Sequence, residues 1–318
     1  MQIDVFNGDA DGICGLVQLR LANPTESQLV TGTKRDIHLL ANLSVVANDS
    51  VTVLDISLKK NRPDVDRILQ QGASVFYIDH HEAGDIPLHP RFKSMINTAA
   101  NTCTSLLVDE YLAGKFRAWA VTAAFGDNLI GRAEQLSQTL GLTVKEIEQL
   151  KNLGVCINYN GYGSALTDLH FEPAVLYRHL VQHQSPFNFI ADNPTIHEQL
   201  LAAYIDDREQ ALLIKPEYMT AAVALYILPD QAWARRVFGV FGNELANNAP
   251  ERAHAVLTHH PKGGYQVSVR APLNNSSGAD ELCTLFASGG GRKSAAGINH
   301  LPMNDLAIFM DAFVRQYS

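Results

Sequence analysis

The sequence predicts an α/β protein with two domains. A larger N-terminal domain has a mainly parallel sheet with helices on both faces, and a helical linker joins it to a smaller α/β domain. Three observations lead to this fold class. The first half alternates short β-branched segments with helical patterns, as expected of strand-helix-strand units. A stretch with two prolines, 185–194, interrupts the pattern and a long helical segment, 196–213, follows it. From about residue 219 the alternation starts again.

The N-terminal elements follow from periodicity. Short runs of β-branched and aromatic residues are predicted as strands, and longer segments with apolar residues every three or four positions as helices. The strands are 3–6, 28–31, 51–54 and 74–78, and the helices are 11–21, 63–71, 104–112 and 116–129. Because the strands alternate with helices, the sheet should be parallel, and its ligands should lie beyond the carboxyl ends of the strands.

The rest of the chain divides at the proline-containing stretch. Residues 132–183 are predicted to be helical and peripheral, with a loop at 158–163, and the helix at 196–213 suits a connector between domains. In the last hundred residues, strands are expected at 220–227, 253–259 and 264–270, and helices at 231–247 and 279–287. The predicted domains are 1–190, a helical linker 191–215, and 216–318.

Composition excludes several classes of protein. A chain of 318 residues with 46% hydrophobic and 18% charged residues suits a globular protein with two cores. The net charge of −8 disfavours tracking of long nucleic acid, which depends on neutralising many phosphates. No stretch has the ~20 apolar residues of a membrane span, and we expect a cytoplasmic protein. Its oligomeric state stays open. The four cysteines are scattered and form no metal-binding pair, so buried thiols are expected.

Acidic residues follow three of the apolar segments. Segment 3–6 leads into Asn7-Gly8-Asp9-Ala10-Asp11-Gly12, segment 51–54 into Asp55, and segment 119–125 into Gly126-Asp127. Two carboxylates separated by one residue can point the same way above a sheet, and Gly12 permits a tight turn into a helix. Taken alone, Asp9 and Asp11 are equally well explained as helix caps.

The triplet Asp79-His80-His81 ends the fourth segment, Val75 to Ile78. Imidazoles beside a carboxylate can both bind a divalent cation and move a proton. Because neighbouring side chains in an extended segment point in opposite directions, one histidine is expected to bind metal and the other to face the substrate. The alternative is a solvated turn. The chain's other histidine pair, His259-His260, lacks companion carboxylates and is interpreted as the end of a strand.

Together these segments supply four to five carboxylates and one or two imidazoles without a thiolate. Such ligands favour Mn²⁺ or Mg²⁺, with iron, cobalt or zinc as alternatives. The number of anionic ligands exceeds the need of one ion, so two ions about 3.5–4 Å apart are expected. A pair of this kind generates hydroxide at neutral pH and stabilises a leaving oxygen. The ligand set therefore predicts hydrolysis of a phosphoester.

A glycine-rich run near the C-terminus is the candidate anion site. Gly289-Gly290-Gly291-Arg292 offers consecutive backbone N–H groups and a guanidinium, although a plain tight turn is an equally good interpretation. Between residues 262 and 300 there are four Lys or Arg, at 262, 270, 292 and 293, against two acids, at 280 and 281. Arg270 ends a predicted strand and could reach the same anion. We predict an anion clamp here, for a phosphate or a carboxylate, with Ser294 as a further substrate-binding residue.

With these residues assembled, the chain resembles the DHH phosphoesterase superfamily, in the branch with a DHHA1 substrate domain. The motifs that carry the resemblance are Asp9-Ala10-Asp11-Gly12, Asp55, Asp79-His80-His81, Gly126-Asp127, and the glycine signature 289–297. They cover both domains. The resemblance implies a DHH domain, a DHHA1 domain and a dinuclear site in a cleft between them, with Mn²⁺ as the expected metal and Mg²⁺ or Co²⁺ as alternatives.

The resemblance also implies roles for individual residues. Asp9, Asp11, Asp55, His80 and Asp127 would be the metal ligands, with Asp55 bridging both ions. His81 would face the scissile phosphate and assist the leaving group, while Asp79 would hold a histidine in place. Two positions depart from the family. Asn7 or Val5 stands where it usually has His or Asp, so Asn7 is a further candidate ligand, and Arg292 stands where the glycine signature more often has His.

Family members act on several phosphoesters, which leaves alternatives open. The chain has no room for the extra domains of the exonucleases that act on long strands and lacks the transmembrane segments of the membrane-bound members. We therefore predict cleavage of a linear dinucleotide, pGpG, to mononucleotides, a step in cyclic dinucleotide turnover. The alternatives are a 3'-phosphoadenosine 5'-phosphate phosphatase, a nanoRNase of broader specificity, or a nucleotide-binding regulator that has lost catalysis.

Overall fold

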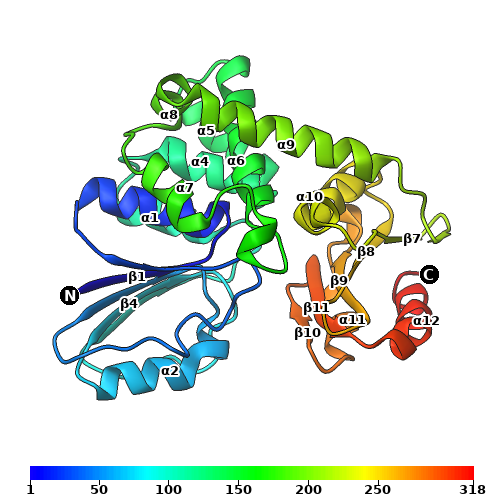
Figure 1. The fold of residues 1–318 in the computed structure, drawn as a ribbon, viewed down its shortest axis with the longest axis horizontal. Helices are drawn as coiled ribbons and strands as arrows, with labels where there is room; N and C mark the ends of the chain where they lie inside the picture. Colours follow the sequence, from blue (N-terminus) through cyan, green and yellow to red (C-terminus); the bar gives the residue numbers. More distant parts are fainter. The chain divides into compact units, whose positions relative to one another are not determined.

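A computed structural model describes all 318 residues, which fold into two compact units, residues 1–202 and 203–318. The division falls within the long helix α9 (Pro194–Leu212). Figure 1 shows the succession of elements along the chain. None of the helices combines the length and apolar composition needed to cross a bilayer.

The first unit is built on a five-stranded sheet in which every pair of neighbours is parallel. Its strand order is β2-β1-β3-β4-β5. The strands are β1 (Gln2–Phe6), β2 (Gln28–Val30), β3 (Ser50–Leu54), β4 (Ser74–Asp79) and β5 (Phe92–Ile96). The predicted parallel sheet is confirmed. In this order β2 lies on one side of β1, and the later strands β3, β4 and β5 lie on the other. The strand order therefore reverses at β1 and β3, and α/β proteins bind ligands beyond the carboxyl ends of the strands at such a switch point.

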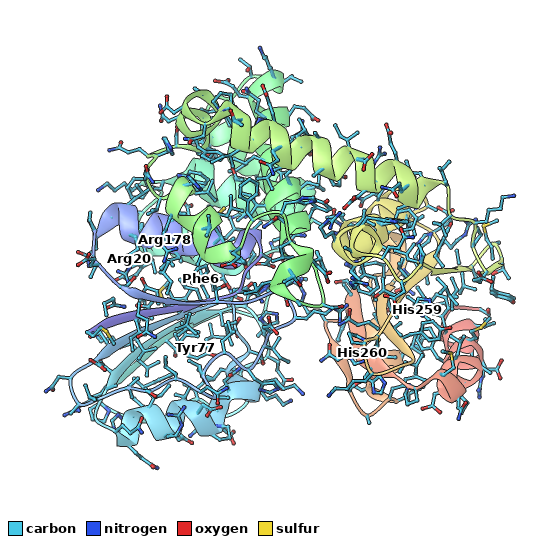
Figure 2. All side chains as sticks on the ribbon, in the orientation of Figure 1. Phe6, Arg20, Tyr77, Arg178, His259 and His260 are labelled. Carbon is cyan, nitrogen blue, oxygen red and sulfur yellow. The ribbon has the colours of Figure 1, made fainter.

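Helices cover both faces of this sheet, as the sequence predicts. In Figure 1, α2 (Leu58–Gln70) lies on one face, while α1 (Ala10–Ala22), α4 (Arg117–Gly126) and α7 (Pro173–Leu180) lie on the other. The buried aromatic residues follow this division (Figure 2): Phe6 packs against Tyr177 of α7, and Tyr77 joins the core beneath α2. The Tyr77 hydroxyl donates to the Ile56 carbonyl at 2.7 Å, so this buried phenol is hydrogen-bonded.

The helical part of this unit contains α3 (Thr104–Tyr111), α5 (Ile130–Thr139), α6 (Val144–Asn160) and α8 (Pro186–Asp192) in addition. Helices α4 and α6 approach closely at Gly154. A Cβ added to Gly154 would lie 2.0 Å from the Thr122 carbonyl oxygen, so only glycine permits this contact. The close packing fixes the C-terminal end of α4, where Asp127 is the capping residue.

Several boundaries differ from the sequence prediction. Helix α2 begins at Leu58 and contains Pro63, because the buried Leu58 and Asn61 anchor a turn ahead of the proline. Helix α4 ends at Gly126, three residues earlier than expected, and Asn128 adopts a positive φ of 60°. The segment from 158 to 160 is the end of α6 instead of a loop. Strand β5 was not foreseen, because Pro90 and Arg91 obscure its short pattern.

The second unit has a mixed six-stranded sheet of order β10-β11-β9-β8-β7-β6, in which only β7 and β8 are parallel. Its core includes Phe309 and Phe313. The elements are β6 (Tyr218–Met219), β7 (Val223–Ile227), α10 (Ala232–Asn248), β8 (Ala253–His259), β9 (Tyr265–Arg270), α11 (Ala279–Thr284), β10 (Gly289–Gly291), β11 (Ala295–Leu301) and α12 (Leu306–Tyr317), with short 3-10 turns at Leu273–Asn275 and Met303–Asp305. A further 3-10 turn, Leu166–Asp168, belongs to the first unit. The predicted strand at 253–259 is confirmed, and it ends at His259 as the sequence suggested.

The glycine run is a strand, not the loop expected from its composition. Gly289, Gly290 and Gly291 form the edge strand β10, which pairs antiparallel with β11. A Cβ on Gly289 would lie 1.7 Å from the Cys283 carbonyl oxygen, so α11 and β10 meet backbone to backbone. Arg292 follows at the tip of the hairpin, and its N–H donates to the Ala295 carbonyl at 2.9 Å. Gly289 and Gly291 therefore serve close packing, whereas a Cβ on Gly290 would meet open space.

His254 gives the second unit a pH-dependent stability. Its side chain is buried in β8 and its Nδ1 has no hydrogen-bond partner. Burial, with a smaller contribution from Arg252, lowers the pKa of His254 to about 4. The unfolded chain therefore binds the proton first as the pH falls, and the folded state loses stability from about pH 6.5 downward.

Between pH 7 and pH 5 this residue is expected to reduce the free energy of unfolding by about 2 kcal/mol. Urea unfolding of the wild type and of His254→Leu at both pH values measures it. The variant should lose that much less than the wild type on acidification. Thr258→Val, at a buried position of the same strand without a titrating group, is the control and should follow the wild type.

Candidate metal centre

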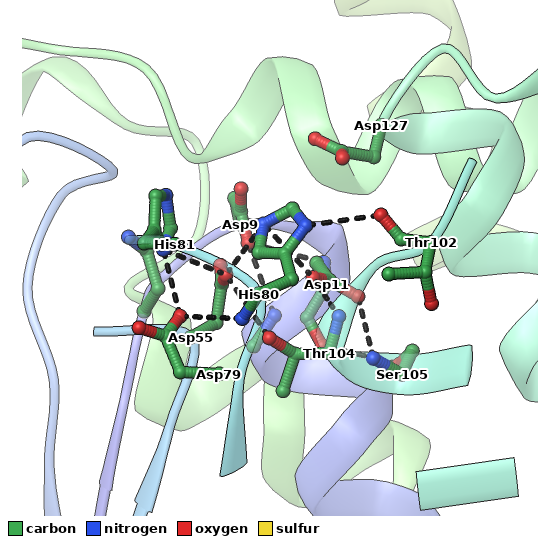
Figure 3. A network of polar contacts seen from close by, with 12 residues as sticks. Asp9, Asp11, Asp55, Asp79, His80, His81, Thr102, Thr104, Ser105 and Asp127 are labelled. Atoms are coloured by element: carbon green, nitrogen blue, oxygen red, sulfur yellow. Dashed lines mark hydrogen bonds and ion pairs between the residues drawn. The ribbon is translucent and has the colours of Figure 1, made fainter. Parts of the chain in front are cut away.

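Five carboxylates and two imidazoles lie together at the carboxyl edge of the parallel sheet (Figure 3). They come from the end of β4, from the residues just after β1, β3 and β4, including the first turn of α1, and from the end of α4. The structure therefore brings together all the acids and histidines that the sequence predicts for the site in the first unit. They are Asp9, Asp11, Asp55, Asp79, His80, His81 and Asp127.

The first two carboxylates are positioned by the start of α1. Asp9 is the N-cap of this helix, and its Oδ1 accepts the N–H groups of Asp11 and Gly12 at 3.0 and 3.1 Å. Asp11 lies in the first turn. Its Oδ2 and Oδ1 each accept a backbone N–H at 2.7 Å, from Thr104 and Ser105. Asp9 is thus the cap that the sequence offered as an alternative, whereas Asp11 is anchored by the N-terminus of α3.

Asp55 follows β3 in an unusual conformation. Its φ of 58° lies in the left-handed region, which aspartate and asparagine adopt more readily than most residues. The side chain is almost fully buried, and its Oδ1 accepts from the Thr104 hydroxyl at 3.2 Å. The left-handed turn therefore directs this carboxylate into the cluster.

The two histidines are oriented differently, as their adjacency predicts. His80 is buried and its Nδ1–H donates to the Thr102 carbonyl at 3.0 Å, which leaves Nε2 as a lone-pair donor inside the cluster. The His81 side chain is 39% exposed, and its Nδ1–H donates to Asp79 Oδ1 at 2.7 Å. Burial favours the neutral ring, but the charge of Asp79 and this hydrogen bond outweigh it and raise the pKa of His81.

The side chains of Asp11, Asp55 and His80 approach one another closely. The Nε2 of His80 lies 3.3 Å from Asp55 Oδ1 and 3.8 Å from Asp11 Oδ2. Ligand atoms of Asp55, His80 and His81 also lie within 4.8 Å of one another. The Nδ1 of His81 is engaged by Asp79, and the His81 ring is the more exposed of the two.

The pKa values of the two buried acids indicate a site for a cation. Burial raises the pKa of Asp11, and burial with the charges of Asp9 and Asp11 raises the pKa of Asp55 well above its usual range. Acids with raised pKa values next to an imidazole lone pair are stabilised in their charged form by a bound divalent ion. Carboxylate and imidazole donors thus fit a divalent cation held by Asp11, Asp55 and His80.

Asp9 and Asp127 belong to a second part of the cluster, which contains Lys34. The Lys34 ammonium forms an ion pair with Asp9 Oδ2, donates to Asn158 Oδ1 at 3.0 Å, and lies 4.0 Å from Asp127 Oδ1. Asn7 lies beside this group. Its Nδ2 donates to the Lys34 carbonyl at 3.1 Å, while its buried Oδ1 has no hydrogen-bond partner.

The predicted substrate residues belong to the second unit. The Arg270 guanidinium donates to Asn243 Oδ1 and Ser268 Oγ, each at 2.7 Å, and so braces β9 against α10. Ser294 lies beside it at the hairpin tip, where its carbonyl accepts the Ala271 N–H at 3.0 Å. Arg292 is half-buried at the same tip. Arg270 is thereby engaged within its own unit.

Sequence reasoning missed four residues of the site. Thr102, Thr104 and Ser105 orient His80, Asp55 and Asp11, and Lys34 balances the charge of Asp9. The sequence does hold an indication for Lys34. This residue lies shortly after the end of β2, as the acids lie at or shortly after the ends of β1, β3 and β4. The prediction of buried thiols is confirmed for all four cysteines.

No family model matches the chain, and no curated protein matches it. Solved structures do. An exonuclease RecJ bound to manganese is 18% identical, with a TM-score of 0.58 over 99% of this chain and 89% of that one. RecJ in complex with Mn²⁺ from Thermus thermophilus is 17% identical, with a TM-score of 0.61 over 98% of this chain, which spans about half (51%) of that protein.

A third similar structure is PggH, a pGpG-specific phosphodiesterase from Vibrio cholerae. It is 15% identical, with a TM-score of 0.55, and the match covers 99% of this chain and 98% of that one. These similarities show that the chain has the two-domain α/β fold of DHH/DHHA1 proteins, as the sequence motifs implied.

Proposed function

We propose that the protein is a divalent-metal-dependent phosphoesterase that cleaves short linear nucleotides, with pGpG as its substrate. The observation that carries the proposal is the buried convergence of Asp11, Asp55 and His80 at the switch point of the sheet. The fold shared with a pGpG-specific phosphodiesterase, over nearly the full length of both chains, supports the choice of substrate.

The chemistry follows from the division of the site. Asp11, Asp55 and His80 would hold the cation, with Mn²⁺ as the metal, in line with the manganese present in both RecJ structures. A divalent ion held there polarises phosphoryl oxygens and makes a water molecule more acidic. Asp79 orients His81 through Nδ1 and, with its charge, raises the pKa of His81. In the imidazolium form that this favours, Nε2 carries the proton that would be given to the leaving oxygen of the substrate.

The direct test is hydrolysis of a substrate panel with Mn²⁺. The panel contains pGpG, pApA, longer RNA, single-stranded DNA, 3'-phosphoadenosine 5'-phosphate and pyrophosphate. We expect pGpG to be cleaved fastest, to two mononucleotides. Absence of cleavage of every member by folded protein with bound Mn²⁺ would falsify the enzyme proposal and favour a nucleotide-binding regulator.

The second candidate is an exonuclease that acts on longer strands. The observation in its favour is the fold similarity to two RecJ structures, with TM-scores of 0.58 and 0.61. The net charge of −8 counts against it, because affinity for long strands depends on neutralising phosphates. Faster release of mononucleotides from 20-nucleotide DNA than from pGpG would establish this second activity in place of the first.

Arg292 is proposed to hold a substrate phosphate or a guanine edge without contacting the metal. Arg292→Ala should therefore raise KM by about 10- to 100-fold, the loss of one hydrogen bond to a charged group, with little change in kcat. Steady-state kinetics with pGpG and calorimetric titration of Mn²⁺ measure the two effects. Metal affinity should stay at the wild-type value.

The matched control is Arg315→Ala, at an exposed arginine of α12 in the same unit. It should leave KM unchanged. An Arg292→Ala enzyme with the wild-type KM would remove Arg292 from the substrate site without touching the assignment of the metal ligands.

A further inference from the structure

Both oxygens of the Asp9 carboxylate are engaged, and one of them contacts a cation of the protein itself. Its Oδ1 caps α1 by accepting two backbone N–H groups, from Asp11 and Gly12. Its Oδ2 is in direct contact with the Lys34 ammonium. The side chain is buried, so water does not replace these partners. This arrangement differs from the dinuclear centre that the sequence resemblance implies, in which Asp9 is a metal ligand.

Lys34 is held at this place by its surroundings. Its N–H donates to the Gly161 carbonyl at 2.7 Å, and its own carbonyl accepts from Asn7 at 3.1 Å. The ammonium lies 5.3 Å from the centre of the Tyr162 ring, a cation–π distance. The loops after β1 and β2 also touch, because a Cβ on Gly8 would lie 2.0 Å from the Gly32 carbonyl oxygen. The backbone thus places the lysine beside Asp9.

The position of the ammonium is that of a cation shared between two acids. It contacts Asp9 Oδ2 and Asn158 Oδ1 and lies 4.0 Å from Asp127 Oδ1. A divalent ion at the same position would repel the ammonium and compete for the same oxygens. A lysine ammonium in contact with a buried carboxylate is charged at neutral pH.

We propose that the centre binds one divalent cation, at Asp11, Asp55 and His80, and that the Lys34 ammonium occupies the position of a second ion beside Asp9 and Asp127. The inference rests on the proposed phosphoesterase function and deepens it. A lysine built into the fold supplies positive charge next to the reacting phosphate at any metal concentration. The protein would then depend on a single metal-binding equilibrium.

The test is the metal stoichiometry of the full chain, measured by calorimetric titration with Mn²⁺ and by electron paramagnetic resonance of the loaded protein. For the wild type we expect one ion per chain and the six-line spectrum of isolated Mn²⁺. Lys34→Met keeps the aliphatic stem and removes the charge. It should bind two ions per chain and show the broadened spectrum of two coupled ions.

Two variants serve as controls. Lys34→Arg keeps the charge and should bind one ion. Lys115→Met changes an exposed lysine that also lies 5.3 Å from an aromatic ring, that of Phe116, but at the opposite end of α4 from Asp127. It too should bind one ion. Thermal melting checks that each variant is folded, and the wild-type measurement decides the main point even if Lys34→Met does not fold.

The outcomes separate this inference from the proposed function. Two coupled ions in the wild type would overturn the role of Lys34 and leave the phosphoesterase proposal intact. A folded Lys34→Met protein that still binds one ion would overturn the claim that Lys34 excludes the second. A wild type that binds no Mn²⁺ would overturn the proposed metal-dependent function itself.

Discussion

Asp55→Asn is expected to abolish turnover and nearly all Mn²⁺ binding while leaving the fold intact. Asparagine has the same size and adopts the left-handed conformation of residue 55, with φ 58°, as readily as aspartate. Mn²⁺ affinity should fall by more than about 100-fold, because losing a group that merely orients a ligand already costs about 10- to 100-fold. Turnover should fall by about 1000-fold or more.

Thermal stability distinguishes this effect from unfolding. Burial and the neighbouring acids Asp9 and Asp11 raise the pKa of Asp55, so its charge is unfavourable without metal. The metal-free variant should melt at or above the wild-type temperature, and Mn²⁺ should no longer raise its Tm. Asp49→Asn is the matched control, at a buried aspartate before the other end of β3. It should keep the Mn²⁺-induced rise in Tm, and a loss of that rise in the control would refute the assignment of Asp55.

Arg20→Met should produce a large loss of stability in the first unit. Arg20, in the last turn of α1, forms a buried ion pair with Asp4 of β1, with Nε 2.8 Å from Asp4 Oδ2. Removing the guanidinium leaves a buried carboxylate that keeps only the neutral donors Ser27 and Gln2. The free energy of unfolding should fall by about 3 kcal/mol, at the lower end for a broken buried pair.

Urea unfolding in a Trp233→Phe background measures this loss, because the buried Trp119 then reports on the first unit alone. The double variant Asp4→Asn with Arg20→Met removes both charges and should recover at least half of the loss. Mn²⁺ affinity should stay unchanged, because Arg20 and Asp11 lie at opposite ends of the 13-residue helix. Equal losses in the single and double variants would show that packing, and not the charge of Asp4, is responsible.

Local pattern was sufficient for much of the fold and of the site. Segments 3–6, 51–54 and 74–78 have strand composition, and each becomes a parallel strand within one residue of the predicted limits. Because parallel strands align their carboxyl ends, acids far apart in the chain were expected to meet, and Asp11, Asp55 and His80 do. Local pattern failed at β10, where glycine composition indicated a loop and pairing with β11 made a strand.

The sequence by itself determined which residue types collect at the edge of the sheet, because strand ends are local signals that a parallel sheet brings together. Only the tertiary structure decided how their charges are paired. Lys34 reaches Asp9 through the path of a loop, and the Thr102 carbonyl sets the ring of His80 from 22 residues away. Such partners depend on backbone positions that no local pattern encodes. The physical consequence is that the Lys34 ammonium, in place of a second metal ion, can balance the charges of Asp9 and Asp127.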